Sequence, residues 1–413
     1  MIKRFIVIVA LFSAFWAKAQ ENTSSPYSYY GIGLTNFKGT VENRAMGGLS
    51  TFSDSIHMNL TNPAGYGKLA RTTYTAAASV ESTQQETSEA DDQVSNVSLD
   101  YLGLGVPVGR FGFGAGLIPY SSVGYRILDI EGDAASRLQG RGGMNKVFLS
   151  AAYAISRDLS IGVNADYNFG NIQRRRTVLR DGIQYGTRDI DRSDISGFNF
   201  NFGLDYQTKL NNGLKLHASA VYTPEADITT ESYREIANVI FNANGENVLN
   251  VRNFDVESQD ITLPSKTTFG LGLGRPNKWF VGGEYSAFGS IPEISVFSTP
   301  VNDAEYNDGS AYRLGGYIVP EYNSLTSYFK RVVYRFGGRF EETGLQLNGE
   351  SIDEFGISFG LGLPIGGDFS NLNLGLEYGQ RGTTSSGLIQ ENFFKLSIGL
   401  SLNDQWFVKR KFN

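Results

Sequence analysis

The feature that most constrains this chain is a two-residue alternation of apolar and polar side chains that recurs along most of its length. In residues 159–169 every second side chain is apolar, and serine, glycine, asparagine or aspartate lies between them. Residues 198–207, 355–363 and 394–402 repeat the pattern without a charge on the apolar face. The alternation predicts β-strands that each turn one face toward an apolar environment.

Strand length indicates what that environment is. Strands of soluble proteins average about 5–6 residues, whereas a tilted strand needs about 9–11 residues to cross a bilayer. The alternating segments here run to about ten residues or more, as a bilayer requires. A secreted β-sandwich or propeller is the alternative, but neither explains this length.

The connections between the segments alternate in length as well. Short turns are predicted at 108–110, 156–158, 210–213, 275–278 and 365–368. Short periplasmic turns and long outer loops are typical of an outer-membrane barrel. The longer polar stretches between those turns lie near residues 82–93, 125–142, 172–195, 226–258, 289–310, 343–351 and 382–388.

We therefore predict an all-β fold, a transmembrane antiparallel barrel of about fourteen strands. The second strand changes phase between Tyr101 and Leu102, as a β-bulge would, and the tenth ends in a long turn from Pro320 to Arg331. Trp279 and Phe280, just after a tight turn, suit an interfacial aromatic girdle. The predicted strands are 71–83, 94–107, 111–124, 143–156, 159–172, 195–208, 214–226, 259–275, 279–290, 311–319, 332–342, 353–364, 371–381 and 390–402.

The first 19 residues have the features of a signal peptide. Lys3 and Arg4 precede an apolar run of about a dozen residues that ends at a small-residue cleavage site, and this run is shorter than the roughly 20 residues of a spanning helix. A membrane anchor is the alternative. We expect export to the cell outer membrane, with residues 71–413 forming the barrel and the lipid bilayer around it.

Composition excludes several classes of site. The chain has no cysteine and only two histidines, His57 and His217, so we expect no metal site, no cofactor and no catalytic constellation built on histidine. The net charge is −6, and no basic run exceeds Arg174 to Arg176, so nucleic acid is not an expected partner. The protein is not expected to be an enzyme.

Residues 20–70 do not alternate and are rich in turn-forming residues, with one short helix predicted around residues 54–60. They form either a disordered tail or a hatch, a plug folded into the lumen. Three tyrosines and several aliphatic side chains favour the hatch, because a disordered segment would lack them. These are Tyr27, Tyr29, Tyr30, Ile32, Leu34, Met46 and Leu49.

Three short motifs in this segment resemble the hatch of the FadL-type outer-membrane transport family. They are "NRAMGG" at residues 43–48, "SDS" at residues 53–55 and the turn "NPAG" formed by Asn62, Pro63, Ala64 and Gly65. The stretches "LPSKTTFGLGLG" and "WFVGGEYSAFGSIP" resemble two later strands of the family. The stretches "SPYSYYGIG" and "NDQWFVKRKFN" resemble the version of the family found in Bacteroidota.

The resemblance implies a hatch-plugged, fourteen-stranded barrel that takes up hydrophobic small molecules such as fatty acids and releases them sideways into the membrane. FadL-like barrels can also be non-transporting subunits of larger secretion, assembly or nutrient-uptake complexes, bound to other outer-membrane proteins or lipoproteins. A continuous apolar tunnel would favour transport; a sealed lumen and an apolar outer loop would favour the subunit role.

Lateral release requires an interrupted strand, and a proline cannot donate a ladder hydrogen bond. Pro119, preceded by Gly116, is therefore the predicted kink or lateral opening; a bulge that only shapes the barrel is the alternative. Residues 226–258 contain apolar side chains at 236, 237 and 239–241, which would form either a capture patch or a docking surface for a partner.

The two-residue alternation places several charged side chains on the inward face of the barrel. Charges in a lumen usually pair with one another and with a plug, although an arginine could instead hold a carboxylate head group. The predicted luminal residues are Arg335, Arg339, Glu341 and Glu284, joined by Glu377 and Lys395.

Overall fold

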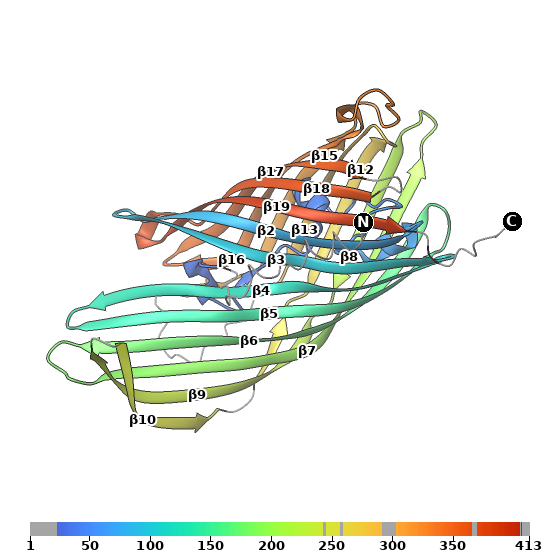
Figure 1. The fold of residues 1–413 in the computed structure, drawn as a ribbon. Helices are drawn as coiled ribbons and strands as arrows, with labels where there is room; N and C mark the ends of the chain where they lie inside the picture. Colours follow the sequence, from blue (N-terminus) through green and yellow to red (C-terminus); the bar gives the residue numbers. More distant parts are fainter. Residues whose placement is uncertain are drawn as a thin grey trace, which may run out of the picture.

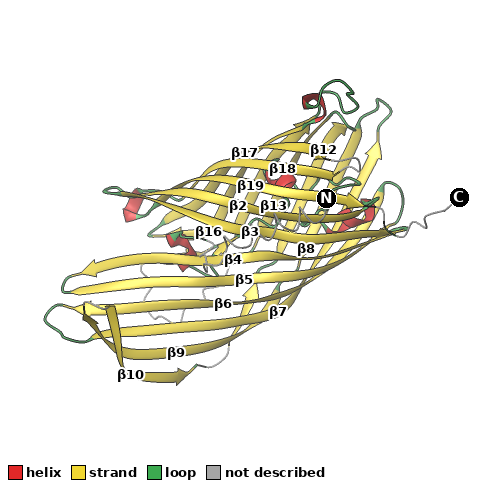
Figure 2. Cartoon of the chain, in the orientation of Figure 1, coloured by secondary structure: helices red, strands yellow, loops and turns green. Residues whose placement is uncertain are grey.

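A computed structural model describes residues 23–242, 245–256, 259–290, 303–365, 370–404 and 406. The predicted signal peptide lies outside these residues. Nearly all regular structure within them is β (Figure 2). No helix of the described chain is long and apolar enough to cross a membrane.

The barrel is closed and has 14 antiparallel strands, as predicted. Each strand pairs with its neighbours, and the seam joins the last strand to the first from Gln390–Glu86 to Asp404–Thr72. The barrel strands are β2 (Thr72–Glu86), β3 (Asp91–Val108), β4 (Phe111–Glu131), β5 (Ala134–Ala154), β6 (Leu159–Arg180), β7 (Gly186–Lys209), β8 (Lys215–Thr223), β12 (Lys266–Arg275), β13 (Trp279–Phe288), β15 (Gly309–Ile318), β16 (Val333–Leu347), β17 (Glu350–Ile365), β18 (Ser370–Arg381) and β19 (Gln390–Asp404).

One side of the barrel extends well beyond the rest at the long-loop end (Figure 1). β7 has 24 residues, whereas β13 has 10. β9 (Ala226–Asn242) pairs with the first part of β7, and β10 (Gly245–Asp255) folds back along β9. β11 (Gln259–Leu263) also pairs with β9, and β14 (Ala304–Tyr306) pairs with β16.

The prediction of loops at 125–142, 172–195 and 226–258 was wrong. These stretches are mostly strand. Backbone pairing continues through their charged residues, beyond the apolar band, where loops were expected. The apolar residues Ala237 and Val239 are consequently buried by pairing with β7 and do not form an exposed patch. The bulge predicted between Tyr101 and Leu102 lies one residue away, at Asp100. Ala77 of β2 pairs with Tyr101 and Ala78 pairs with Leu99, so Asp100 is the extra residue on β3.

Residues 23–70, the N-terminal segment, hold four short elements. They are η1 (Pro26–Tyr29), β1 (Leu34–Thr35), α2 (Val41–Arg44) and η2 (Pro63–Lys68). The helix predicted around 54–60 is absent; the Asp54 carboxylate instead accepts from the Ile56 and His57 amides and stabilises a turn. Two further turns, η3 (Phe329–Arg331) and η4 (Ser385–Gly387), lie outside this segment.

The apolar core lies between the N-terminal segment and the barrel wall. Tyr29 packs edge-on against both Tyr30 and Tyr125 of β4, with ring centroids about 5 Å apart. Phe280 of β13 is buried against Met46 and Leu49, so it points inward. The prediction that Phe280 belongs to a lipid-facing aromatic girdle was therefore wrong. Most exposed large apolar side chains of the strands face outward instead, as a bilayer requires.

Candidate functional site

The N-terminal segment is bonded to inward-facing groups on strands all around the barrel. On one side, Ser28 donates to the Gly124 carbonyl of β4, and Ser160 of β6 donates to the Ala64 carbonyl. On the other, the Gly47 amide donates to Ser358 of β17. The segment is therefore fixed at several heights and around most of the circumference, which is the position a plug would occupy.

A chain of ion pairs crosses β16 to β19 on the inner surface. Glu377 binds Arg339 at 2.9 Å and also pairs with Arg44 of α2, which ties the N-terminal segment into the chain. Glu354 bridges Arg339 and Arg381, the latter at 2.6 Å, and Arg381 binds Glu391 at 2.9 Å. All of these side chains are largely buried, so each charge depends on its partners.

Each predicted luminal residue has a charged or polar partner, and Lys395 lies 3.4 Å from Glu81 of β2. Arg339 belongs to the chain of ion pairs, and Arg335 donates to Asn373, which in turn donates to Glu42 of α2. Sequence reasoning missed Arg313, which lies 3.3 Å from Glu284 and 3.7 Å from Glu341. Its inward parity on β15 was the signal that would have found it.

Glu284 also fixes the N-terminal segment directly. Its carboxylate accepts from the Ser50 amide at 2.8 Å, the Ser50 hydroxyl at 2.7 Å and the Thr51 hydroxyl at 3.2 Å. The charge is therefore neutralised by Arg313 on one side and solvated by the segment on the other. Bonded in this way, Glu284 ties the N-terminal segment to the barrel wall.

The predicted turn at Asn62 to Gly65 forms the start of η2. The Asn62 side chain accepts from the Ala64 amide and caps the short helix, while Pro63 occupies its first position, where a missing N–H costs nothing. The Asn62 amide group donates to the Leu204 carbonyl of β7. The turn is thus anchored to the wall before the chain enters β2.

Glycines on the wall make this close approach possible. A Cβ atom at Gly162 would lie 2.5 Å from the Pro63 carbonyl carbon, and one at Gly203 would overlap the Asn62 side chain. Gly112 and Gly114 of β4 leave room in the same way for the backbone and ring of Tyr66. The turn therefore lies flat against β4 to β7.

His57 forms a smaller polar cluster near the end of β18. Its Nδ1 lies 2.7 Å from Asp54, and its Nε2 faces Asn371 at 3.2 Å and Glu42 at 3.9 Å. Burial alone would lower the His57 pKa, but the carboxylates of Asp54 and Glu42 raise it above its ordinary value. Burial alone would raise the Asp54 pKa, but His57 and the hydrogen bonds from the Ile56 and His57 amides lower it below its ordinary value.

The ladder between β3 and β4 is short. Pairing runs from Val108–Phe111 to Leu102–Leu117 and ends there, although both strands continue. Gly116 is still paired with Gly103 of β3, whereas Pro119 pairs only with Asn145 of β5, next to a bulge. Beyond this point, β1 of the N-terminal segment takes the vacated edge of β4 through Leu34–Ser122 and Thr35–Ser121.

The family model BamG matches residues 1–413. The chain belongs to the BamG family. A search of curated protein sequences found no match.

Solved structures show what the fold of this BamG-family barrel resembles. The toluene transporter TodX of Pseudomonas putida is 17% identical, with a TM-score of 0.59 over 90% of this chain and 99% of that one. The monoaromatic hydrocarbon channel CymD is 15% identical, with a TM-score of 0.57 over 90% and 99%. A Pseudomonas aeruginosa FadL homologue is 11% identical, with a TM-score of 0.55 over 90% and 98%. These likenesses show that the BamG-family barrel shares the fold of these three proteins.

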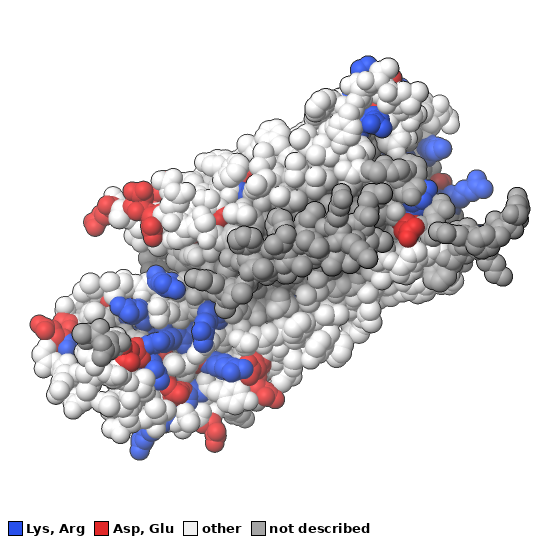
Figure 3. Space-filling view, in the orientation of Figure 1, with Lys and Arg blue, Asp and Glu red and all other residues white. Residues whose placement is uncertain are grey.

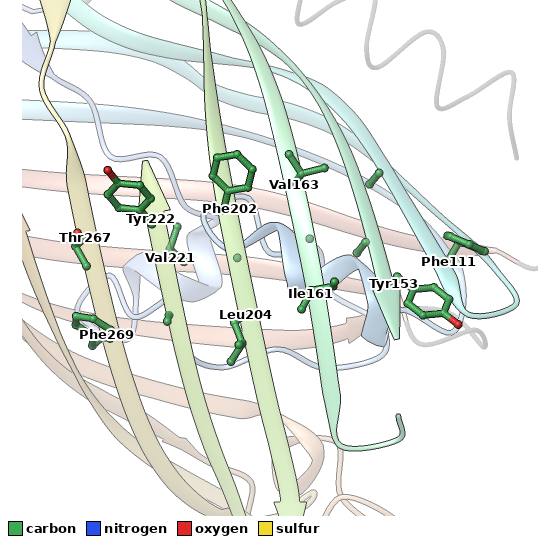
Figure 4. A pocket seen from close by; sticks show the side chains of 15 residues that line it. Phe111, Tyr153, Ile161, Val163, Phe202, Leu204, Val221, Tyr222, Thr267 and Phe269 are labelled. Atoms are coloured by element: carbon green, nitrogen blue, oxygen red, sulfur yellow. The ribbon is translucent and has the colours of Figure 1, made fainter. Parts of the chain in front are cut away.

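The outer wall of the BamG-family barrel carries two adjoining apolar grooves. The larger, of about 680 Å³, lies between outward side chains such as Phe111, Ile161, Phe202 and Phe269 (Figure 4). Small residues between them leave this space. Because the groove faces the bilayer and not the lumen, it does not form a passage through the barrel.

No group of histidine and acidic side chains in the described part of the chain could hold a metal ion. The described residues of the BamG-family barrel interact with the N-terminal segment through ion pairs, hydrogen bonds and apolar contacts. These interactions hold a segment or a ligand in place.

Proposed function

We propose that this protein is an accessory barrel subunit of an outer-membrane protein complex, namely one that assembles outer-membrane proteins, a role that the family name BamG suggests. The observation that carries the proposal is the polar filling of the lumen: Arg339, Glu354 and Glu377 are buried in mutual ion pairs, and Arg44 of the N-terminal segment joins them. An apolar ligand would need apolar surface at this height.

The one-sided extension supports the same role. β10 pairs with β9 alone among the described strands, so its other edge has backbone groups that a partner strand could meet. Tyr233, Val251 and Phe254 are exposed on this hairpin. A transporter that worked alone would gain nothing from an apolar, open-edged projection outside the membrane.

Purification from native membranes in mild detergent tests the proposal. We expect large outer-membrane partners to co-purify in stoichiometric amount with the full chain, and a variant in which Tyr233, Val251 and Phe254 are all changed to serine to lose them. The matched control changes the bilayer-facing Phe269 to leucine and should retain them. A lone barrel that carries lipid in its lumen would contradict the proposal.

Uptake of hydrophobic molecules with lateral exit is the second candidate function. It rests on the interrupted ladder beside Pro119 and on the short strand β1 that occupies the edge. TodX and CymD, which share the fold, are described as a toluene transporter and a hydrocarbon channel. In this mechanism, β1 would leave the edge of β4 to admit a ligand to the bilayer.

The absence of cysteine allows a direct test of that mechanism. A disulfide between Thr35→Cys and Ser121→Cys, which are register partners, should abolish uptake of a fluorescent fatty acid, and reduction should restore it. The control pair, Ser82→Cys with Ser95→Cys, consists of register partners in the unbroken part of the β2–β3 ladder and should have no effect. Equal uptake by the locked and reduced proteins would exclude the route.

A further inference from the structure

The outer face of the one-sided extension carries a cluster of arginines. Tyr125, Leu138 and Ile172 are buried against the N-terminal segment, so side chains that alternate with them point away from the lumen. Arg126 of β4 and Arg137 and Arg141 of β5 occupy such outward positions and are exposed. Figure 3 shows Lys and Arg side chains gathered at this end of the molecule, with Asp and Glu side chains among them.

Strand register brings these side chains together. Arg126 is paired with Gln139, so it lies between Arg137 and Arg141 on the neighbouring strand. Arg141 is paired across the other edge of β5 with Gln173. The three guanidinium groups therefore share one patch, within reach of a single multivalent anion.

Two of the three arginines, Arg137 and Arg141, differ from other arginines of the extension in their partners. Toward β7, Arg188 is bound to Glu235 at 2.6 Å and Arg192 to Asp194 at 3.0 Å. Arg141, in contrast, donates from Nε and Nη2 to the neutral Gln173 side chain. Within the described chain, neither Arg137 nor Arg141 has a carboxylate within 4.0 Å, and β4 and β5 present no acidic side chain at the neighbouring outward positions.

The height of the patch relates it to the membrane surface. On the same wall Tyr167 packs against Phe198, with ring centroids 4.9 Å apart, and stacks on Phe169; such outward aromatics mark the bilayer interface. Gln173 lies six residues further along β6, which is roughly 15 Å on a tilted strand. A phospholipid head-group region is only about 5–7 Å thick, so at this height the patch meets the larger phosphorylated sugar head group of a glycolipid and not the phosphate of a phospholipid.

We propose that Arg126, Arg137 and Arg141 bind the phosphorylated head group of an outer-leaflet glycolipid. The planar guanidinium groups match phosphate oxygens in bidentate geometry, and Gln139 and Gln173 can bond sugar hydroxyls. The apolar wall below accommodates the acyl chains. The site is independent of the accessory-subunit role, because it uses the bilayer-facing side of β4 to β6 and not the β9–β10 hairpin.

The test uses the full-length protein in mild detergent, with native mass spectrometry to count bound lipid. The probes are phosphorylated lipid A and the same lipid after removal of its phosphates. We expect wild type to bind the phosphorylated form about ten-fold more tightly, and the double variant Arg137→Gln, Arg141→Gln to lose that preference. The control, Arg110→Gln with Arg157→Gln at the short turns, removes the same charge and should keep it.

Several outcomes would overturn the proposal. One is equal preference in the double variant and the control, with both showing the wild-type melting temperature. Displacement of lipid A by inorganic phosphate at matched concentration would assign the site to free phosphate. Loss of a co-purifying protein while the lipid preference persists would make the patch a protein interface.

Discussion

The N-terminal segment meets two sides of the barrel in different ways. Against β4 to β7, the Asn62–Gly65 turn lies on wall glycines such as Gly162 and Gly203, and the fit is one of shape. Against β16 to β19, Arg44 joins a chain of buried ion pairs through Glu377, and the fit is one of charge. One segment is thus held by contacts that respond to volume on one side and to charge on the other.

The largest expected effect comes from breaking the charged side. Glu354→Ala leaves Arg339 and Arg381 buried without the carboxylate that bridges them, so we expect the free energy of unfolding to fall by about 3 kcal/mol. Urea unfolding followed by tryptophan fluorescence measures it. Glu321→Ala, which breaks an exposed pair with Lys330, is the control and should change little. Equal effects would show that the buried chain adds nothing.

Adding volume on the glycine side should cost somewhat less. Gly162→Val forces the turn away from the wall, for which we expect a loss of about 1–3 kcal/mol and release of the N-terminal segment to protease. Gly283→Val is the matched control, because a Cβ there meets its nearest atom only at 3.7 Å. If the two variants were equally protected from protease, close packing would not hold the turn.

Removing the Asn62 cap tests the contact of the turn with β4 to β7 without adding volume. Asn62→Ala loses the acceptor for the Ala64 amide and the donor to Leu204, and we expect a loss of about 1 kcal/mol in urea unfolding. Asn62→Asp keeps the acceptor and loses only the donor, so it should lie between the alanine variant and wild type. An aspartate variant no better than alanine would mean that the bond to the wall, not the cap, is what matters.

The smallest expected effect depends on pH. Because the His57 pKa is raised in the folded protein, the stabilisation is complete below the ordinary histidine value and is lost as pH rises through the folded value. Protease protection of the segment should therefore decline as pH rises above the ordinary histidine value. His57→Gln should flatten this dependence, and a slope that persisted in the variant would assign it to another group.

The sequence predicted the barrel and the inward charges because both follow from a two-residue period. Parity alone places Arg335, Arg339 and Glu284 inside. Parity does not say which charges meet, because that depends on strand register; the Arg339–Glu354 pair requires Arg339 to lie opposite Gly356 and not one residue away. The partners of the network could therefore not be derived from the pattern.

The errors share a physical cause. Strands were expected to end where apolar alternation ended, but a ladder needs only backbone hydrogen bonds and compatible side chains, so β4 continues past Tyr125 with Arg126 and Ile127. The short helix was predicted at 54–60 from local composition, whereas α2 begins at Val41, where Thr40 and Asn43 form a reciprocal cap. That capping pair was the overlooked signal.

The seam between β19 and β2 also dictates an order of events during biogenesis. The first strand can be paired on its second side only when the last, ending at Asp404, has been delivered. Residues 23–70 make bonds inside the ring, from Ser25 to Glu391 and from Ala64 to Ser160. Closing the seam therefore completes the wall around residues 23–70, and the bonds of the segment to β6 and β19 then join strands from opposite halves of the chain.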